Sequence, residues 1–281
     1  MSVDSGPKEF VRLGESDFVN EALKIVETAN SRQVCLRILG ALAVYVHSLD
    51  KSECTDAFKS LGRFGEGKPT FTDLDLAAYG KQKNQTNKVF QDLKFKPDIM
   101  VNAFFGNRRL IFYHPHNIFH VDIFLDKLEF SHDVRFGEKP GSGRLELDYP
   151  TITLEDIVLE KLQIHQINRK DLIDLIVLFI GHEVAEQSTK DMVAGSYIAS
   201  VLSEDWGFWF DATTNLDKVK SLAVEFENSR KLTHEQVKRA LNGIAKLNSI
   251  VEKTPKTDKW KVRSRVGTTK PWFKEVEEVQ R

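Results

Sequence analysis

Apolar runs of strand length are confined to the first half of the chain. This distribution restricts the possible folds more than any other feature of the sequence. Strand-like runs occur at residues 35–39, 71–80, 108–114 and 117–126, and helical spacing of apolar residues occurs at 15–30, 41–49 and 83–95. After Pro150 the pattern is helical, at residues 151–167, 169–181, 189–203, 215–228 and 233–250. The chain is therefore predicted to be α+β, with an α/β core over residues 1–150 and a helical domain with a basic tail over residues 151–281.

Capping and turn residues mark several predicted boundaries. Thr153 and Asn168 stand where a side-chain oxygen can cap the helices that follow them, and Gly181 stands at the predicted end of the second helix. The cluster Gly62, Gly65, Gly67 and Pro69 predicts a loop over residues 51–70.

Composition excludes several classes of protein. No apolar run approaches the ~20 residues that a membrane span requires. The two cysteines, Cys35 and Cys54, cannot form a disulfide framework, which fits a reducing compartment. We therefore expect a cytoplasmic protein with no membrane partner.

The formal net charge of -1 conceals a separation of charge along the chain. Residues 246–281 contain ten Lys and Arg against five Asp and Glu, a net charge of +5, so the rest of the chain carries -6. Trp260, Trp272 and Phe273 alternate with these basic residues. Such a tail suits contact with a nucleic acid, and it equally suits docking on the acidic body.

Two acidic residues interrupt an otherwise apolar strand. Asp73 and Asp75 lie two positions apart, so on a strand their side chains point to the same face. Burying two carboxylates there is costly unless a cation lies between them. Asp122, in the later run HVDIFLD, would join them if the two strands are neighbours, and three converging carboxylates suit two Mg²⁺ ions. The alternative is an ordinary Asp-x-Asp pair at a strand end, without a metal.

A strand, a glycine and a helix follow one another around Gly40. Such a unit leaves backbone N–H groups at the helix N-terminus, where a phosphate group can bind. The alternative is that Gly40 only allows close packing of the strand against the helix.

In this order, the segments RILGALAVYVHS, FTDLDLA and FHVDIFLD resemble the polymerase-beta-type nucleotidyltransferase superfamily. The later segment LEDIVLEKLQIHQINRKDLIDLIVLF is similar to the lysine-bearing helical segment of its abortive-infection toxin-like branch. The resemblance covers roughly residues 30–180 and implies a small mixed sheet with flanking helices as a nucleotidyltransferase core.

The resemblance also implies an activity, an enzyme that moves a nucleoside monophosphate from an NTP such as ATP to a hydroxyl group with the help of two Mg²⁺ ions. The implied residues are Gly40 and Ala41 for the triphosphate, Asp73, Asp75 and Asp122 for metal binding and catalysis, and Lys161 for the nucleotide. The superfamily usually has Gly or Ser where this chain has Ala41, so one hydroxyl contact is lost while the backbone N–H remains. The implied acceptor is RNA or tRNA, a protein or a small molecule, and a cognate antitoxin is an implied partner.

Two further groups of residues have competing interpretations. Lys161, His165 and Arg169 are predicted to share a helix face, which could meet a nucleotide. For His165 and Arg169 the alternative is a basic stripe exposed to solvent. Asp171 and Asp174 could support this helix or pair with the neighbouring Arg169 and Lys170. Of His114, His116 and His120, one is expected beside Asp122, and a zinc site is disfavoured because Pro115 would scatter the three rings.

A second function class is a non-catalytic nucleotide- or RNA-binding module, such as one half of a toxin–antitoxin pair. Ala41 and the basic tail favour it. A binding module would not require Mg²⁺, which separates the two hypotheses.

Overall fold

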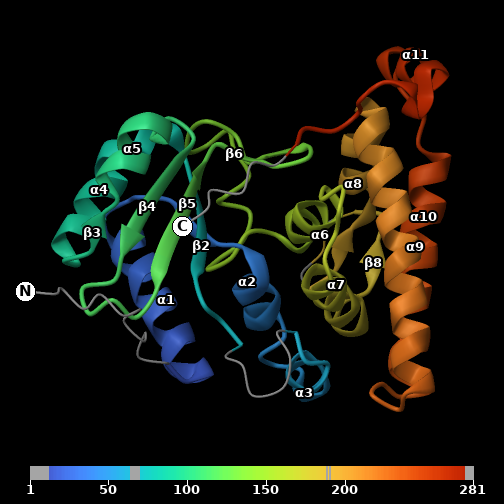
Figure 1. Cartoon of the computed structure of the whole chain (residues 1–281), viewed down its shortest axis with the longest axis horizontal. Coiled ribbons are helices and arrows are strands. Elements are labelled where there is room, and N and C mark those ends of the chain that lie inside the picture. Colours follow the sequence, from blue (N-terminus) through green and yellow to red (C-terminus); the bar gives the residue numbers. More distant parts are fainter. Residues whose placement is uncertain (1–12, 64–69, 188, 190, 276–281) are drawn as a thin grey trace, which may run out of the picture.

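The computed structural model describes residues 13–63, 70–187, 189 and 191–275. This part of the chain is a mixed α+β structure that contains eleven α-helices and a five-stranded sheet. The sheet and its helices form one side of the molecule, and the later helices form the other side (Figure 1). The α+β class and the predicted order, sheet first and helices second, are therefore confirmed.

The main sheet has the spatial order β1 (Leu36–Ile38), β2 (Leu74–Ala78), β5 (His120–Leu125), β4 (Arg109–Tyr113) and β3 (Lys96–Pro97). In this sheet β2 and β5 run parallel, and the other neighbouring pairs are antiparallel. The β2–β5 register places Asp75 opposite Asp122. The small mixed sheet is therefore present, and β1, β2, β4 and β5 are the strands that the apolar runs predict.

The helices of the first half lie around this sheet: α1 (Glu15–Ser31), α2 (Gly40–His47), α3 (Ser52–Ser60), α4 (Lys83–Asp92), α5 (Ile99–Phe105) and the 3₁₀ turn Gly80–Gln82. The predictions of α1, α2 and α4 are confirmed. α1 contacts β1 and α4, whereas α2 packs between β2 of the sheet and the later helices α6 and α7. α5 was not expected from the sequence, and it lies at the outer edge of the sheet (Figure 1).

The prediction of a loop over residues 51–70 is wrong in its first part, where α3 forms. Cys54, Ala57 and Phe58 are buried at helical spacing, and this packing stabilises the helix. The glycines that suggested a loop begin only at Gly62, after the helix has ended. Residues 64–69 of the predicted loop lie outside the described residues.

The second half contains α6 (Leu154–Leu162), α7 (Arg169–Gly181), α8 (Gly195–Glu204), α9 (Trp206–Asn228), α10 (His234–Lys253), α11 (Asp258–Val266) and the 3₁₀ turn Gly267–Thr269. Its start is preceded by a hairpin of β6 (Lys127–Glu129) and β7 (Asp133–Arg135), and β8 (Val184–Ala185) pairs with β9 (Val193–Ala194). α9 begins well before its predicted start at residue 215, because Asp205 caps it by accepting a hydrogen bond from the Phe208 N–H. The sequence did not predict α11.

The predicted caps of α6 and α7 are confirmed. Thr153 accepts a hydrogen bond from the Asp156 N–H, and Asn168 accepts one from the Asp171 N–H. α7 ends at Gly181, as predicted.

α6 ends at Leu162, before its predicted end at residue 167. Asn215 of α9 donates to the carbonyl groups of Leu162 and Ile164, at 3.1 and 2.7 Å. These carbonyls therefore have partners outside the helix, so the chain can turn there.

A continuous hydrophobic core joins the two halves. It includes Leu76 and Ile123 from the sheet and Ile157 and Ile176 from the later helices, all fully buried. The division into two domains at residue 150 stays a prediction. Among the described residues, every helix is too short or too polar to cross a membrane.

Candidate functional site

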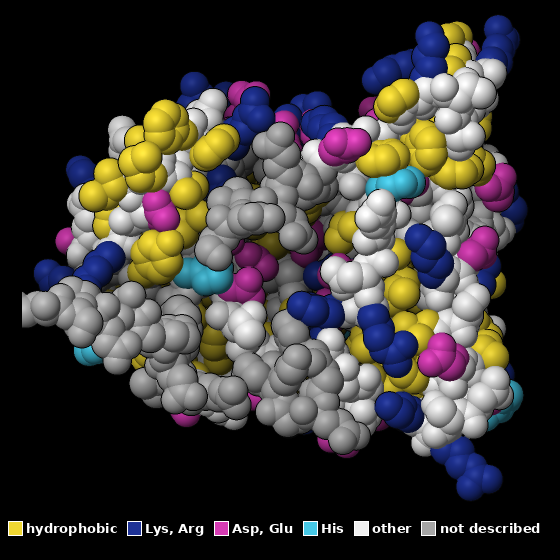
Figure 2. Space-filling model, viewed as in Figure 1, with side chains coloured by type: hydrophobic (Ala, Val, Ile, Leu, Met, Phe, Trp, Pro, Cys, Tyr) yellow, Lys and Arg dark blue, Asp and Glu magenta, His cyan; other side chains and the backbone are white. Residues whose placement is uncertain are grey.

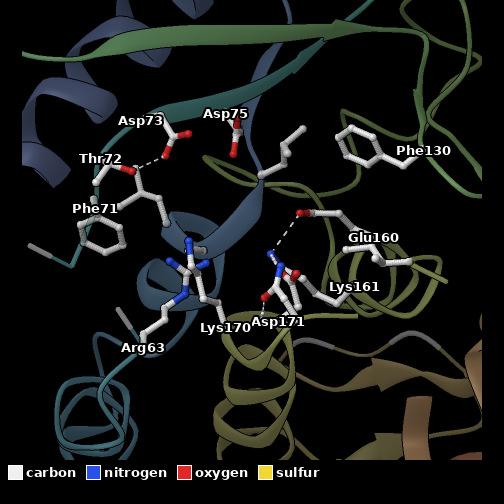
Figure 3. Close-up of a pocket in the computed structure, with 15 residues that line it drawn as sticks. Arg63, Phe71, Thr72, Asp73, Asp75, Phe130, Glu160, Lys161, Lys170 and Asp171 are labelled. Carbon is white, nitrogen blue, oxygen red and sulfur yellow. Dashed lines mark hydrogen bonds and ion pairs between the residues drawn. The ribbon is translucent and has the colours of Figure 1, made fainter. Parts of the chain in front are cut away.

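A cavity of about 250 Å³ lies between the sheet and the helical half (Figure 3). Its walls come from the strand region of β2, from the start of α2, and from α6 and α7. Figure 3 shows Asp73 and Asp75 pointing from the sheet toward Arg63, Lys170 and Lys161 on the opposite wall. The cavity therefore has carboxylates on the sheet wall, and on the opposite wall cations together with the carboxylates of Glu160 and Asp171.

The three predicted aspartates lie at one end of the β2–β5 pair. Asp75 and Asp122 are opposite each other in register, and Asp73 immediately precedes β2. His120 Nε2 lies between two of them, 3.8 Å from Asp73 Oδ2 and 3.7 Å from Asp122 Oδ2. The placement of Asp75 opposite Asp122 and the histidine beside Asp122 agree with the sequence-based expectations, whereas the convergence of all three acids as a metal site stays a prediction.

Asp75 is partly buried and lies close to three other carboxylates. Burial raises its pKa well above the ordinary value, and the negative charges of Asp73, Asp122 and Glu160 raise it further. A bound cation would relieve this repulsion. The carboxylate oxygens are ligands of the kind that Mg²⁺ prefers, so the chemistry of Asp73 and Asp75 suits the metal that the resemblance implies.

Asp122 has a partner that the sequence analysis missed. Arg109 donates two hydrogen bonds to its carboxylate, Nε to Oδ1 at 3.1 Å and Nη2 to Oδ2 at 2.6 Å. Within the described part of the chain, no group of three or more His, Cys, Asp or Glu side chains is arranged to hold a metal ion. Metal binding by Asp122 therefore requires its carboxylate to be shared with, or released by, Arg109. Only the neighbouring strand runs, RRLIFYH and HVDIFLD, could have suggested this pair.

Gly40 is required by the local geometry. Its φ of +72° is one that residues with side chains rarely adopt, and a Cβ there would lie 3.0 Å from Asp75 Oδ2. It is the first residue of α2, and its N–H donates to Glu160 Oε2 at 3.0 Å. The glycine thus permits close packing, as one interpretation expected, whereas its N–H is bound by Glu160 and phosphate binding there stays a prediction. Ala41 lines the cavity.

Glu160 is a second residue that the sequence analysis missed. It is buried, it lines the cavity, and burial raises its pKa, although Lys161 and the Gly40 N–H act in the opposite direction. An acidic residue beside Lys161 in an amphipathic helix carries no distinctive sequence signal, because such neighbours are common on solvated helix faces.

Lys161 lines the cavity but is already paired. Its ammonium lies 2.9 Å from Asp171 Oδ1, 3.2 Å from Asp174 Oδ2 and 3.4 Å from Glu160 Oε1. Burial alone would lower the pKa of Lys161, but these carboxylates outweigh it and raise the pKa well above its ordinary value. Asp171 and Asp174 therefore support Lys161, which was one of the two roles expected for them.

Arg63 and Lys170 add positive charge to the helical wall of the cavity. Arg63 donates to both carboxylate oxygens of Asp174, at 2.8 and 3.1 Å. It follows α3, in the region that was predicted to be a loop, and nothing in its sequence context marks it as a cavity residue. The prediction that Lys161, His165 and Arg169 share one helix face is wrong, because α6 ends at Leu162 and α7 begins at Arg169. Arg169 is exposed and lies 3.9 Å from Glu225.

The aromatic residues of the C-terminal tail dock on the body. Trp272 Nε1 donates to Asp211 at 3.0 Å, and the Phe273 ring stacks on His165 with a centroid distance of 3.6 Å. The Lys274 N–H donates to the Ser131 carbonyl at 3.0 Å. Docking is therefore confirmed for this part of the tail, whereas its contact with nucleic acid stays a prediction.

Comparison of the chain with known protein families, with curated proteins and with solved structures finds no match in any of the three. What the site can do is therefore judged from its residues and their geometry.

Proposed function

We propose that the chain is a Mg²⁺-dependent nucleotidyltransferase of the polymerase-beta type, which acts in the cytoplasm. One observation carries this proposal: Asp75 and Asp122 face each other on parallel strands, and the Gly40 turn packs directly against Asp75. An acidic pair beside a helix N-terminus offers adjacent places for a divalent cation and for a phosphate group.

The acids of the sheet wall would hold the metal. Asp73 and Asp75 would be the principal ligands, and Asp122 would join them where Arg109 releases its carboxylate. Mg²⁺ bound there would neutralise charge on a triphosphate and lower the pKa of an attacking hydroxyl.

The opposite wall would hold the nucleotide. The N–H groups of Gly40 and Ala41 and the cations Arg63, Lys161 and Lys170 would face the triphosphate. In the reaction, the acceptor's hydroxyl oxygen forms a bond to the α-phosphorus, and the bond from that phosphorus to the bridging oxygen breaks. Pyrophosphate leaves, and Asp122 accepts the hydroxyl proton. Most of the catalytic effect would come from positioning and charge neutralisation.

The test is transfer of label from α-labelled NTPs in the presence of Mg²⁺, with total RNA, tRNA, protein and aminoglycosides as acceptors. Asp73→Asn and Asp75→Asn should each abolish transfer, with a loss of at least about 100-fold. Asp92→Asn, an exposed acid on α4, is the matched control and should retain activity. Unchanged transfer in both site variants would refute the assignment.

A specific observation favours the second candidate, a non-catalytic nucleotide- or RNA-binding module within a toxin–antitoxin pair. The Gly40 N–H is engaged by Glu160, and Lys161 and Arg63 are paired with carboxylates. Nucleotide or RNA binding that needs no Mg²⁺, together with the absence of transfer to every acceptor, would support this candidate over the enzyme.

A further inference from the structure

The carboxylate of Asp122 already has a cation bound to both of its oxygens. Arg109 donates from Nε to Oδ1 and from Nη2 to Oδ2, at 3.1 and 2.6 Å. An arginine side chain stays charged throughout the physiological pH range, and its planar fork matches the geometry of a carboxylate. Asp122 therefore has a fixed, bidentate counter-ion that belongs to the protein.

The sheet holds Arg109 in this position. The β4–β5 register places Arg109 opposite Phe124, two residues beyond Asp122 on β5. Arg109 and Asp122 are thus diagonal neighbours on one face of the sheet. The guanidinium carbon also lies 5.3 Å from the centroid of the Phe124 ring, a cation–π contact. The side chain of Asp122 is only 5% exposed, so moving Arg109 away would leave a buried carboxylate without its counter-ion, which is costly.

The other two acids of the sheet wall face the cavity. Asp73 and Asp75 are among the described residues that line it, and Asp122 is not (Figure 3). The ring of His120 stands between Asp73 and Asp122, 3.8 and 3.7 Å from their carboxylates. Near the centre of Figure 2, acidic side chains, in magenta, lie on the sheet side of the hollow between the two halves, where solvent reaches them. A cation that enters the cavity therefore meets two carboxylates.

Both coordination and charge favour one divalent cation at this wall. Mg²⁺ usually takes one or two carboxylates from a protein and completes its shell with water and phosphate oxygens, so Asp73 and Asp75 suffice. With all three aspartates ionised, Arg109 neutralises one negative charge, and one divalent cation balances the other two. A further ion at Asp122 would have to displace Arg109 and would then lie beside its positive charge.

We propose that the site holds a single divalent cation, on Asp73 and Asp75, and that Arg109 takes the place of a second ion at Asp122. The position of this ion rests on the proposed function. The number of ions departs from the resemblance, which implies two ions with Asp122 as a ligand. Arg109 supplies a fixed positive charge where the two-ion arrangement has a metal.

Counting bound Mn²⁺ tests this inference without any transfer reaction. Electron paramagnetic resonance measures how much added Mn²⁺ stays free, and anomalous diffraction from crystals soaked in Mn²⁺ and a non-hydrolysable ATP analogue locates the ions. The wild type should bind one Mn²⁺ per chain, and the crystals should show one peak beside Asp73 and Asp75. Asp75→Asn should weaken binding by at least about 10-fold, because it removes a ligand.

Variants of the Arg109–Asp122 pair separate one ion from two. Arg109→Gln should bind a second Mn²⁺, because it releases the carboxylate of Asp122. The double variant Arg109→Gln, Asp122→Asn removes both charges of the pair together, and it should keep one Mn²⁺ with an affinity within about three-fold of the wild type. Arg108→Gln is the matched control, since Arg108 is an exposed neighbour on the same segment, and it should bind one ion like the wild type.

The wild-type count requires no substitution, so it decides the question even if a variant fails to fold. Two Mn²⁺ ions in the wild type, or a peak at Asp122, would overturn the inference and leave the proposed function standing. A single ion in Arg109→Gln, or loss of the ion in the double variant, would overturn the role of Arg109. A wild type that binds no Mn²⁺ would refute both the inference and the metal dependence of the proposed function.

Discussion

At the scale of single residues, Glu160 occupies the backbone N–H group of the Gly40 turn. Its carboxylate accepts the Gly40 N–H, in the place where the proposed enzyme would bind a phosphate oxygen. It also neutralises part of the charge of Lys161. A nucleotide bound as proposed would therefore compete with an anion that belongs to the protein.

Replacing Glu160 should consequently strengthen nucleotide binding. Glu160→Gln removes the negative charge and keeps an acceptor for Gly40, and Glu160→Ala also frees the N–H. We expect the affinity for Mg²⁺-ATP to rise by about 10-fold in the alanine variant and by less in the glutamine variant. Calorimetric titration at saturating Mg²⁺ measures this. Weaker binding in both variants would show instead that Glu160 helps to hold the metal or the nucleotide.

The buried side chain of His182 should make the stability of the fold depend on pH. Burial lowers its pKa from the ordinary 6.5 to about 4, and nearby Lys51 and His47 act in the same direction. Between these pH values the unfolded chain binds a proton that the folded chain does not, so His182 reduces stability as the pH falls from 6.5 toward 4.

His182→Gln should remove this dependence. The free energy of unfolding of the variant minus that of the wild type should become more positive by up to about 3 kcal/mol as the pH falls from 7 to 4. Urea unfolding of both proteins at a series of pH values measures the difference, which cancels the contributions of all other groups. A pH-independent difference would contradict the buried, neutral state of His182.

At the scale of elements, the N-terminus of α7 positions part of the cavity. Asn168 caps the helix, and the next residues include Lys170 and Asp171, which line the cavity. Asn168→Ala should lower the free energy of unfolding by about 1 kcal/mol, whereas Asn168→Asp should retain most of the stability. Urea unfolding with unchanged m-values would measure this. An alanine variant as stable as the wild type would show that packing alone fixes the start of α7.

Periodic elements and capped helix starts could be predicted from the sequence because each depends on neighbours in the chain. β2 and β5 follow from their apolar runs, and α7 follows from Asn168 and Gly181. α3 and α5 could not be predicted. α3 is stabilised by the burial of Cys54, Ala57 and Phe58, and α5 by hydrogen bonds to β4, so both depend on contacts between distant segments.

The same distinction applies within the site. Gly40, Asp73, Asp75 and Asp122 were predicted because their spacing within strands and turns is informative. The partners Arg109, Glu160 and Arg63 were missed because each meets its carboxylate or N–H group only after folding. The sequence therefore identified candidate ligands, whereas the structure alone revealed the groups that compete with them.

At the scale of the whole molecule, the C-terminal tail ties the two halves together. Trp272 contacts α9, and Phe273 contacts His165 in the segment that follows α6. Lys274 bonds to Ser131 and Asp133 in the hairpin that follows the sheet. The aromatic residues are thus engaged by the protein itself. The separation of charge seen in the sequence serves docking at this point of the molecule.

The cations of α11 offer a way to separate docking from nucleic-acid binding. Lys259, Lys261 and Arg265 are exposed on this helix. Changing all three to Gln should leave the free energy of unfolding nearly unchanged. If the tail also binds RNA, this variant should bind a single-stranded RNA oligonucleotide about 10-fold more weakly, with a salt dependence that is flatter by about 2 in the log–log slope.

Trp272→Ala is the matched variant, because it removes the docking contact and no positive charge. It should lower the free energy of unfolding by about 2 kcal/mol or more and leave the salt dependence of RNA binding unchanged. Fluorescence anisotropy at several salt concentrations and urea unfolding measure the two effects. Equal RNA affinity in the wild type and the triple Gln variant would show that the basic tail serves the fold alone, since phosphate contacts cannot lose three cations without a change in affinity.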